Sequence, residues 1–121
     1  RRFLLFGCGG GRLDHLLANV QSMSRYAKQG ASMRLVDRAY DFFTVHNGVL
    51  PLPKRPLGTL VSVFCLGNEA VGVNLRGLKY PLQNATLTCD FPLGVSNRYA
   101  VGEGAEVSVE RGTLLVMVAV A

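Results

Sequence analysis

The sequence lacks the features that mark a disulfide-rich, zinc-binding or membrane-spanning chain. Its three cysteines, Cys8, Cys65 and Cys89, are odd in number and show no Cys-x-x-Cys spacing. This argues against a disulfide scaffold or a zinc site and favours reduced thiols in a cytoplasmic protein. The apolar runs at 3–6 and 113–121 are shorter than the roughly 20 residues that a membrane helix needs. The first is also shorter than the core of a signal peptide, which takes about 7–15 residues. We therefore expect a cytoplasmic chain with no membrane partner.

The sequence also lacks a concentrated run of charge. Thirteen basic residues stand against eight acidic ones, for a net charge of +5 and a pI near 9.5, and this balance favours anionic partners. The basic residues are scattered, with adjacent pairs only at Arg1-Arg2 and Lys54-Arg55, and no basic stripe alternates with aromatics. We therefore expect no nucleic-acid partner. A basic nucleic-acid-binding β domain is kept as an alternative.

The first 48 residues predict an α/β segment. A short apolar strand at 3–6 runs into a glycine-rich turn, and a helix follows from residue 13 to a stop at Gly30. Two more strands are expected at 33–36 and 42–45. The helix is predicted from apolar residues spaced three and four apart, namely Leu13, Leu16, Leu17, Val20, Met23 and Ala27. Such a segment is too small to stand alone. Because an initiator methionine is also absent, we expect the chain to be N-terminally truncated.

From residue 49 the pattern changes to that of an antiparallel β-sandwich. Three prolines close together, Pro51, Pro53 and Pro56, predict a linker. Short apolar runs separated by turn residues then predict strands, at 59–65, 70–75, 85–89, 106–110 and 113–120. We expect residues 110–113 to close a hairpin and the continuously apolar last strand to be central. The predicted domains are thus 1–48 and 49–121.

The glycine-rich turn before the helix is the first candidate for chemistry. It fits neither a dinucleotide fingerprint, because Arg12 stands where the third glycine should be, nor a P-loop. What remains is a helix N-terminus that can approach an anion. By residue type alone, Asp14 is either a metal ligand or a residue that complements the helix dipole, and Arg12 is either a phosphate contact or part of a surface ion pair.

Three motifs, in order, carry a family resemblance. Residues 10–20 read GGRLDHLLANV, residues 77–82 read GLKYPL and are followed by Asn84, and residues 94–97 read GVSN. Together they resemble the corresponding segments of thiamine pyrophosphokinases, and they span almost the whole chain. The resemblance implies the end of an α/β nucleotide-binding domain followed by a thiamine-binding β-sandwich, which agrees with the break near residue 49. It also implies a homodimer with thiamine near the subunit interface.

The activity that the resemblance implies is the transfer of a pyrophosphoryl group from ATP to thiamine, giving thiamine diphosphate and AMP. Mg²⁺ and cationic donors suit the charge that builds on the phosphate oxygens. A hydroxyl, an amide and an aromatic ring suit thiamine. The expected catalytic residues are Asp14 and Arg12, with Asp14 as metal ligand; the expected nucleotide-binding residues are Gly10, Gly11 and Arg12, and the expected thiamine-binding residues are Ser96, Asn97 and Tyr80. Ser96-Asn97 could equally be an ordinary turn pair. Tyr80 and Tyr99 could each stack against a ring, although a tyrosine in a sandwich more often lies in the core with its hydroxyl at the rim.

The chain departs from the family pattern in two places. It has no match to the acidic Gly-Asp-x-Asp-Ser-type motif of the family's N-terminal portion, and Arg98 follows Asn97 where glutamate is common in the bacterial pattern. We therefore expect the intact protein to be the enzyme and this chain alone to have little or no activity. The alternative is a non-catalytic thiamine-binding or dimerisation module.

Overall fold

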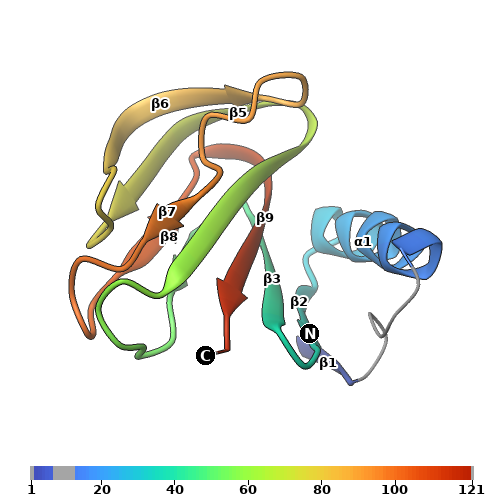
Figure 1. Cartoon of the computed structure of the whole chain (residues 1–121). Helices are drawn as coiled ribbons and strands as arrows, with labels where there is room; N and C mark the ends of the chain where they lie inside the picture. Colours follow the sequence, from blue (N-terminus) through green and yellow to red (C-terminus); the bar gives the residue numbers. More distant parts are fainter. Residues whose placement is uncertain (1, 7–12, 121) are drawn as a thin grey trace.

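A computed structural model describes residues 2–6 and 13–120, which build three layers. Helix α1 covers one face of a first sheet (sheet A), and a second sheet (sheet B) covers the other face (Figure 1). The elements are β1 (Arg2–Phe6), α1 (Leu13–Lys28), β2 (Ser32–Val36), β3 (Tyr40–His46), β4 (Val49–Pro51), β5 (Leu60–Arg76), β6 (Leu82–Thr88), β7 (Asn97–Arg98), β8 (Glu106–Ser108) and β9 (Arg111–Ala119). The predicted sandwich is confirmed, and the fold is mostly β with one helix.

The first three elements form a β-α-β unit at one edge of sheet A. Strands β1 and β2 are parallel, with Arg2 opposite Ser32 and Phe6 opposite Val36. Helix α1 has an acidic residue in its first turn and basic residues in its last turn, as the helix dipole favours. Gly30 follows it at φ +93°. The predicted helix and first strands are confirmed, while their membership in a nucleotide-binding domain remains a prediction. Within the described residues, α1 is not long and apolar enough to cross a membrane.

Sheet A contains strands from both predicted domains. Strand β3 pairs antiparallel with β9, from Tyr40 opposite Ala119 to His46 opposite Thr113. Strand β9 pairs on its other side with β5, so the last strand is central, as its apolar run predicted. The two predicted domains are thus joined by a strand ladder, and a division at residue 48 stays a prediction.

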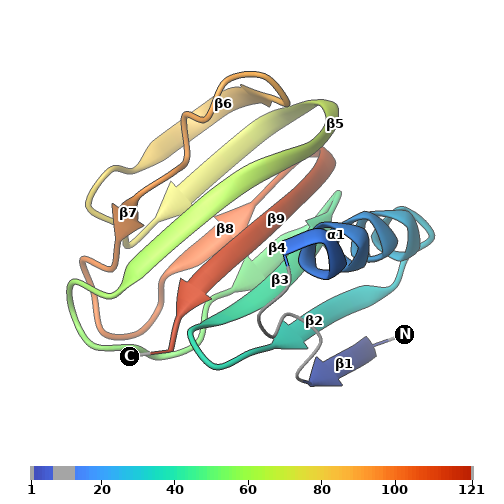
Figure 2. The same ribbon diagram turned by 45° about the vertical axis from the view of Figure 1, so that its right-hand side comes forward.

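Strand β5 belongs to both sheets. It runs unbroken for 17 residues, although the sequence predicted two strands separated by a turn, which is wrong. Its first part pairs with β9 in sheet A, and from Glu69 onward it pairs with β6 in sheet B. The bends lie at Gly67 (φ +108°) and Gly72 (φ +70°), where glycine accepts a backbone that other residues resist. Figure 2 shows β5 curving from one layer into the other.

Two further expectations from the sequence are wrong. Residues 110–113 do not close a hairpin, because β8 pairs with β4 and β5 in sheet B while β9 pairs in sheet A. The connection crosses between layers, held by a hydrogen bond from the Glu110 N–H to the Val71 carbonyl (3.1 Å). The supposed proline linker contains β4, whose Pro51 lies opposite Glu106. Since β4 is an edge strand, a proline there leaves no inner ladder bond unmade.

The two apolar cores share strand β9. Leu114, Val116 and Val118 are buried between the sheets, whereas Leu115 and Met117 pack toward α1. This alternation follows from the two-residue period of a strand. It also explains the continuously apolar sequence of β9, because both faces of the strand are covered.

Candidate functional site

The side chain of Asn97 joins the second and third sequence motifs. Its Oδ1 accepts the backbone N–H groups of Tyr80 and Arg98, both at 2.9 Å, and its Nδ2 donates to the Tyr80 carbonyl at 2.8 Å. The residue is 3% exposed. The amide therefore takes the place of a neighbouring strand for Tyr80, and we call these three hydrogen bonds the Asn97 clamp.

Backbone pairing extends the contact between the two loops. The Lys79 N–H donates to the Arg98 carbonyl and the Ala100 N–H donates to the Gly77 carbonyl, both at 2.8 Å. Gly77 has φ +77°, and a Cβ added there would lie 2.7 Å from Val101 Cγ2. Only glycine fits that conformation and that space, which accounts for the glycine that starts the GLKYPL motif.

Gly94 seats the GVSN loop against β5. Its carbonyl accepts the Val63 N–H at 3.0 Å, and a Cβ added to it would lie 2.6 Å from the Val63 carbonyl oxygen. Backbone contact this close leaves no room for a side chain. The loop is therefore positioned by β5 on one side and by the Asn97 clamp on the other.

Ser96 and Tyr80 present their side chains to solvent beside the clamp. Ser96 has φ +64°, an uncommon conformation for serine, and its N–H donates to the Ser62 hydroxyl at 3.0 Å. Tyr80 is 58% exposed, and the Lys79 ammonium lies 5.4 Å from the centre of its ring. The structure thus brings together the three predicted thiamine-binding residues. A direct contact of Asn97 with thiamine stays a prediction. Since Oδ1 and one Nδ2–H are engaged in the clamp, the second Nδ2–H is the group that could make this contact.

Sequence reasoning missed the clamp, and it offered Tyr99 as a ring-stacking residue. Tyr99 is 2% exposed, and its hydroxyl donates to the Pro53 carbonyl at 2.8 Å. Burial raises the pKa of Tyr99 to about 12, against an opposing effect of Arg55. Tyr99 is therefore a core residue that holds the proline-rich segment. Arg98, by contrast, is exposed and donates to the Gly58 carbonyl at 3.0 Å.

A buried carboxylate outside the predicted site fixes the same segment. Asp41 is 3% exposed, and its Oδ2 lies 2.8 Å from Arg34 Nη2 and 3.0 Å from Arg55 Nη2. Charge-assisted hydrogen bonds of this kind are strong. These two ion pairs connect β2, β3 and the stretch after β4. The sequence analysis did not predict them, because the paired residues do not form a local pattern.

The predicted phosphate side of the site is only partly described. Asp14 is exposed in the first turn of α1, and its Oδ1 accepts the His15 N–H at 2.9 Å. Gly10, Gly11 and Arg12 lie outside the described residues, so their roles stay predictions. Residues 2–6 and 13–120 contain no group of three His, Cys, Asp or Glu side chains that could hold a metal ion. Asp14 alone does not make a magnesium site.

Asp14 and the clamped loops lie apart within one chain. Helix α1 contacts β2, β3 and β9, whereas β7 pairs with β5. In both Figure 1 and Figure 2, α1 and β7 are on different sides of the molecule, with β5 and β9 between them. Of the predicted site residues that the structure describes, Asp14 therefore lies apart from Tyr80, Ser96 and Asn97.

Comparison with models of known protein families assigns the chain to a family. The model described as "Thiamin pyrophosphokinase, vitamin B1 binding domain" matches residues 48–114, more than half of the 121 residues. The chain belongs to this family. The matched range contains both loops that the Asn97 clamp joins.

Individual relatives agree with the family match. The chain is similar to a thiamine pyrophosphokinase of Bacillus subtilis (strain 168), with 28% identity over 113 residues, covering 93% of this chain and 52% of the relative. Among solved structures, it resembles thiamine pyrophosphokinase from Bacillus subtilis (TM-score 0.87, 26% identity, 99% of this chain and 56% of that one). It also resembles the enzyme from Geobacillus thermodenitrificans (TM-score 0.80, 28% identity, 100% and 55%). The chain thus spans about half the length of the relatives it matches.

Proposed function

We propose that the β-sandwich binds thiamine, and that the intact protein transfers a pyrophosphoryl group from ATP to thiamine, giving thiamine diphosphate and AMP. The observation that carries this proposal is the match of the vitamin B1 binding domain over residues 48–114. This range includes the buried Asn97 clamp and the two exposed side chains beside it, Tyr80 and Ser96. A rigid clamp that displays an aromatic ring and a hydroxyl suits a heteroaromatic ligand.

Each side chain at the clamp has a proposed role. The Tyr80 ring forms an aromatic wall against which the ligand stacks, and the Ser96 hydroxyl bonds to the edge of the aminopyrimidine. The Lys79 ammonium lies 5.4 Å from the centre of the Tyr80 ring, and like charges repel. The neutral pyrimidine of thiamine should therefore lie nearer to Lys79 than the cationic thiazolium does.

The phosphate side of the reaction is assigned to the start of α1. Gly10 and Gly11 would offer backbone N–H groups to ATP, Arg12 would neutralise phosphate charge, and Asp14 would bind Mg²⁺ directly or through water. Magnesium would supply charge stabilisation at the phosphate oxygens. Because the described residues contribute one carboxylate at this point and no cluster, the other ligands would come from outside residues 2–6 and 13–120.

A homodimer is the arrangement we propose for the active protein. Asp14 and Ser96 lie on different sides of one chain, as the contacts of α1 and β7 indicate. A second copy could bring the start of its α1 to the clamped loops of the first, which would complete a site at the subunit interface. In this arrangement, residues 1–48 are the end of a nucleotide-binding domain in a cytoplasmic enzyme.

Calorimetric titration with thiamine tests the proposed site. Tyr80→Ala should weaken binding about 10- to 100-fold, because an aromatic contact is lost. Ser96→Ala should weaken it about 5- to 10-fold, as expected for one hydrogen bond. Tyr26→Ala is the matched control, since Tyr26 is 45% exposed on α1 and should leave the affinity unchanged. Unchanged affinity in both site variants would refute the assignment.

An AMP-release assay tests the catalytic half of the proposal. The 121-residue chain should bind thiamine and yet turn over little or no ATP, because the expected acidic motif of the family is absent from it. Turnover comparable with that of a relative of full length would show that this chain carries the complete site. Thiamine binding by an intact protein that has no turnover would instead favour the non-catalytic binding module.

A further inference from the structure

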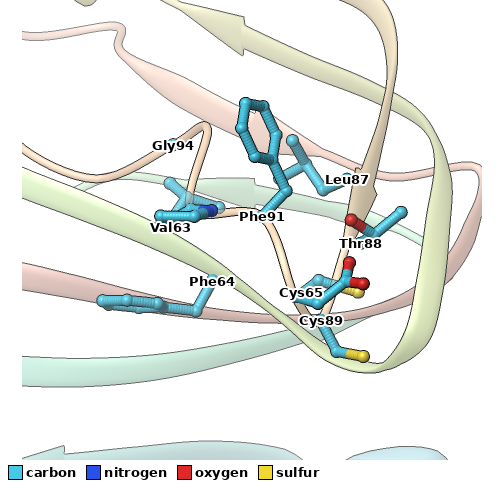
Figure 3. Close-up of a pocket in the computed structure, with 10 residues that line it drawn as sticks. Val63, Phe64, Cys65, Leu87, Thr88, Cys89, Phe91 and Gly94 are labelled. Carbon is cyan, nitrogen blue, oxygen red and sulfur yellow. The ribbon is translucent and has the colours of Figure 1, made fainter.

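Two cysteines distant in the sequence, one in a strand and one in a turn, line one cavity. The cavity has a volume of about 290 Å³, and its lining includes Cys65 of β5 and Cys89, which follows β6. Figure 3 shows both side chains beside Thr88, with Phe91 and Leu87 further along the wall. Cys65 is half-buried, Cys89 is exposed, and neither is in a disulfide. The proposed function uses neither thiol.

The backbone brings the two cysteines together through consecutive carbonyl groups. The Cys65 thiol donates to the Gly67 carbonyl at 3.7 Å, and the Cys89 N–H donates to the Asn68 carbonyl at 3.2 Å. The segment after Cys89 then returns along β5, where the Val63 N–H donates to the Gly94 carbonyl at 3.0 Å. Residues 89–94 therefore run alongside residues 63–68, and the two thiols lie at the same end of this pairing.

The two thiols differ in their exposure to solvent, because Cys65 is half-buried and Cys89 is exposed. Burial raises the pKa of Cys65, with further contributions from Cys89 and Glu69 and an opposing one from Lys28. The Lys28 ammonium is close by, since it lies 3.8 Å from the point that a Cβ on Gly67 would occupy. Asp90 also lines the cavity. Cys65 is therefore held as a thiol, whereas Cys89 is the more accessible nucleophile.

We propose that Cys65 and Cys89 form a thiol–disulfide exchange site whose substrate is a low-molecular-weight disulfide. The Cys89 thiolate attacks one sulfur of the small disulfide, forms a mixed disulfide and releases one thiolate. The Cys65 thiol then passes its proton to the released thiolate, and its sulfur attacks the Cys89 sulfur and displaces the second small thiolate, which takes up the proton that Cys89 lost to water. The two protein thiols lose two electrons and two protons, and the small disulfide gains them as two free thiols.

The link between the cysteines has a structural consequence that does not depend on thiamine binding. It would tie Cys89, at the start of the segment that carries Gly94 and Ser96, to β5. A disulfide needs Cα atoms about 4.4–6.8 Å apart, and the turn that carries Cys89 is already hydrogen-bonded to Asn68 of β5. The linked form should therefore hold residues 90–97 more firmly than the reduced form does.

Non-reducing peptide mapping of the whole chain after incubation with glutathione disulfide tests the site. We expect a peptide pair that links Cys65 to Cys89, has lost two hydrogen atoms and is restored by dithiothreitol. Cys8→Ser should leave this link unchanged. Cys65→Ser should stop at a glutathione adduct on Cys89, because the resolving thiol is gone. Glutathione adducts on both Cys65 and Cys89 without a link, or a link to Cys8, would overturn the proposal.

Hydrogen exchange measures the consequence on the same samples. Amides of residues 90–97 should exchange at least about threefold more slowly in the linked chain, while those of α1 should exchange at the same rate in both forms. The Cys89→Ser variant, treated identically, should show no slowing. Equal exchange of residues 90–97 in the linked and reduced chains would refute the restraint while leaving the exchange chemistry in place.

Discussion

The clamped loops and the start of α1 differ in how firmly the surrounding structure positions their predicted site residues. At the loops, Asn97 is 3% exposed and spends three hydrogen bonds on the backbone, so the positions of Tyr80 and Ser96 follow from the fold. At the start of α1, Asp14 is exposed, and its Oδ1 accepts the N–H of the adjacent His15. Hydrogen bonds of this chain therefore fix the loop side, whereas Asp14 lies at the surface of the described residues.

The largest expected effect is the loss of the Asn97 clamp. Asn97→Ala should lower the free energy of unfolding by about 3 kcal/mol, because it removes three part-buried hydrogen bonds to the backbone of Tyr80 and Arg98. Urea denaturation measures the change. Asn97→Asp should also destabilise the fold, because a carboxylate cannot donate to the Tyr80 carbonyl and would face it as a buried charge. Gln83→Ala, at an exposed residue of β6, should cost nothing measurable. A loss below about 1 kcal/mol in Asn97→Ala would show that the clamp is not what positions the loop.

Gly94→Ala should have the next largest effect. The new Cβ would lie 2.6 Å from the Val63 carbonyl oxygen, so the loop must move away from β5, at a cost of about 2 kcal/mol. Thiamine affinity should fall as well, because Ser96 moves with the loop. Gly102→Ala is the matched control, since a Cβ there meets nothing within 4 Å. Equal stability of the two variants in thermal unfolding would contradict the close approach.

The pH dependence of stability tests whether Tyr99 belongs to the core. Burial raises the pKa of Tyr99 to about 12 from its ordinary value of 10.0, so the unfolded chain loses this proton before the folded chain does. Stability is therefore unaffected below pH 10 and falls between about pH 10 and 12. Tyr99→Phe should lose about 1 kcal/mol at pH 7, and its decline above pH 10 should be shallower than that of the wild type. Parallel pH profiles would refute the assignment.

Asp14→Asn should have the smallest effect on stability. A helix-dipole role alone is worth about 0.3–1 kcal/mol, so the free energy of unfolding should change by about 0.5 kcal/mol or less. In the intact protein, AMP release should fall by about 100-fold if Asp14 binds Mg²⁺. A stability loss above about 2 kcal/mol with normal turnover would make Asp14 a structural residue.

The sequence predicted best where a pattern was local. The spacing of apolar residues predicted α1, where Leu16, Val20 and Met23 pack on sheet A although Leu13 stays exposed. The continuous apolar run of β9 predicted a central strand, because both faces of that strand are covered. The sandwich and its family also followed from the sequence. The motif residues Tyr80, Ser96 and Asn97 do lie together, although their roles toward thiamine stay predictions.

The sequence failed where long-range pairing decides the conformation. Gly67 and Asn68 are typical of a turn, yet β5 passes through them, because both ends of the strand are held by partners distant in the chain. Pro51 indicated a linker, but β8 supplies a ladder for β4. The Asn97 clamp could not be foreseen either, since the partners of a side-chain amide depend on which backbone passes near it, and Tyr80 is 17 residues away.

The pairing of β3 with β9 has a consequence for how the molecule loses its structure. Seven residue pairs join the two strands, and β9 is bound on its other side to the strand that both sheets share. Among residues 2–6 and 13–120, these ladders join the strand before residue 48 to the last strand, and the last strand to β5, which continues into sheet B. Amides of β3 and of β9 should show the same opening free energy in native-state hydrogen exchange, so that the strand before residue 48 and the last strand belong to a single cooperative unit.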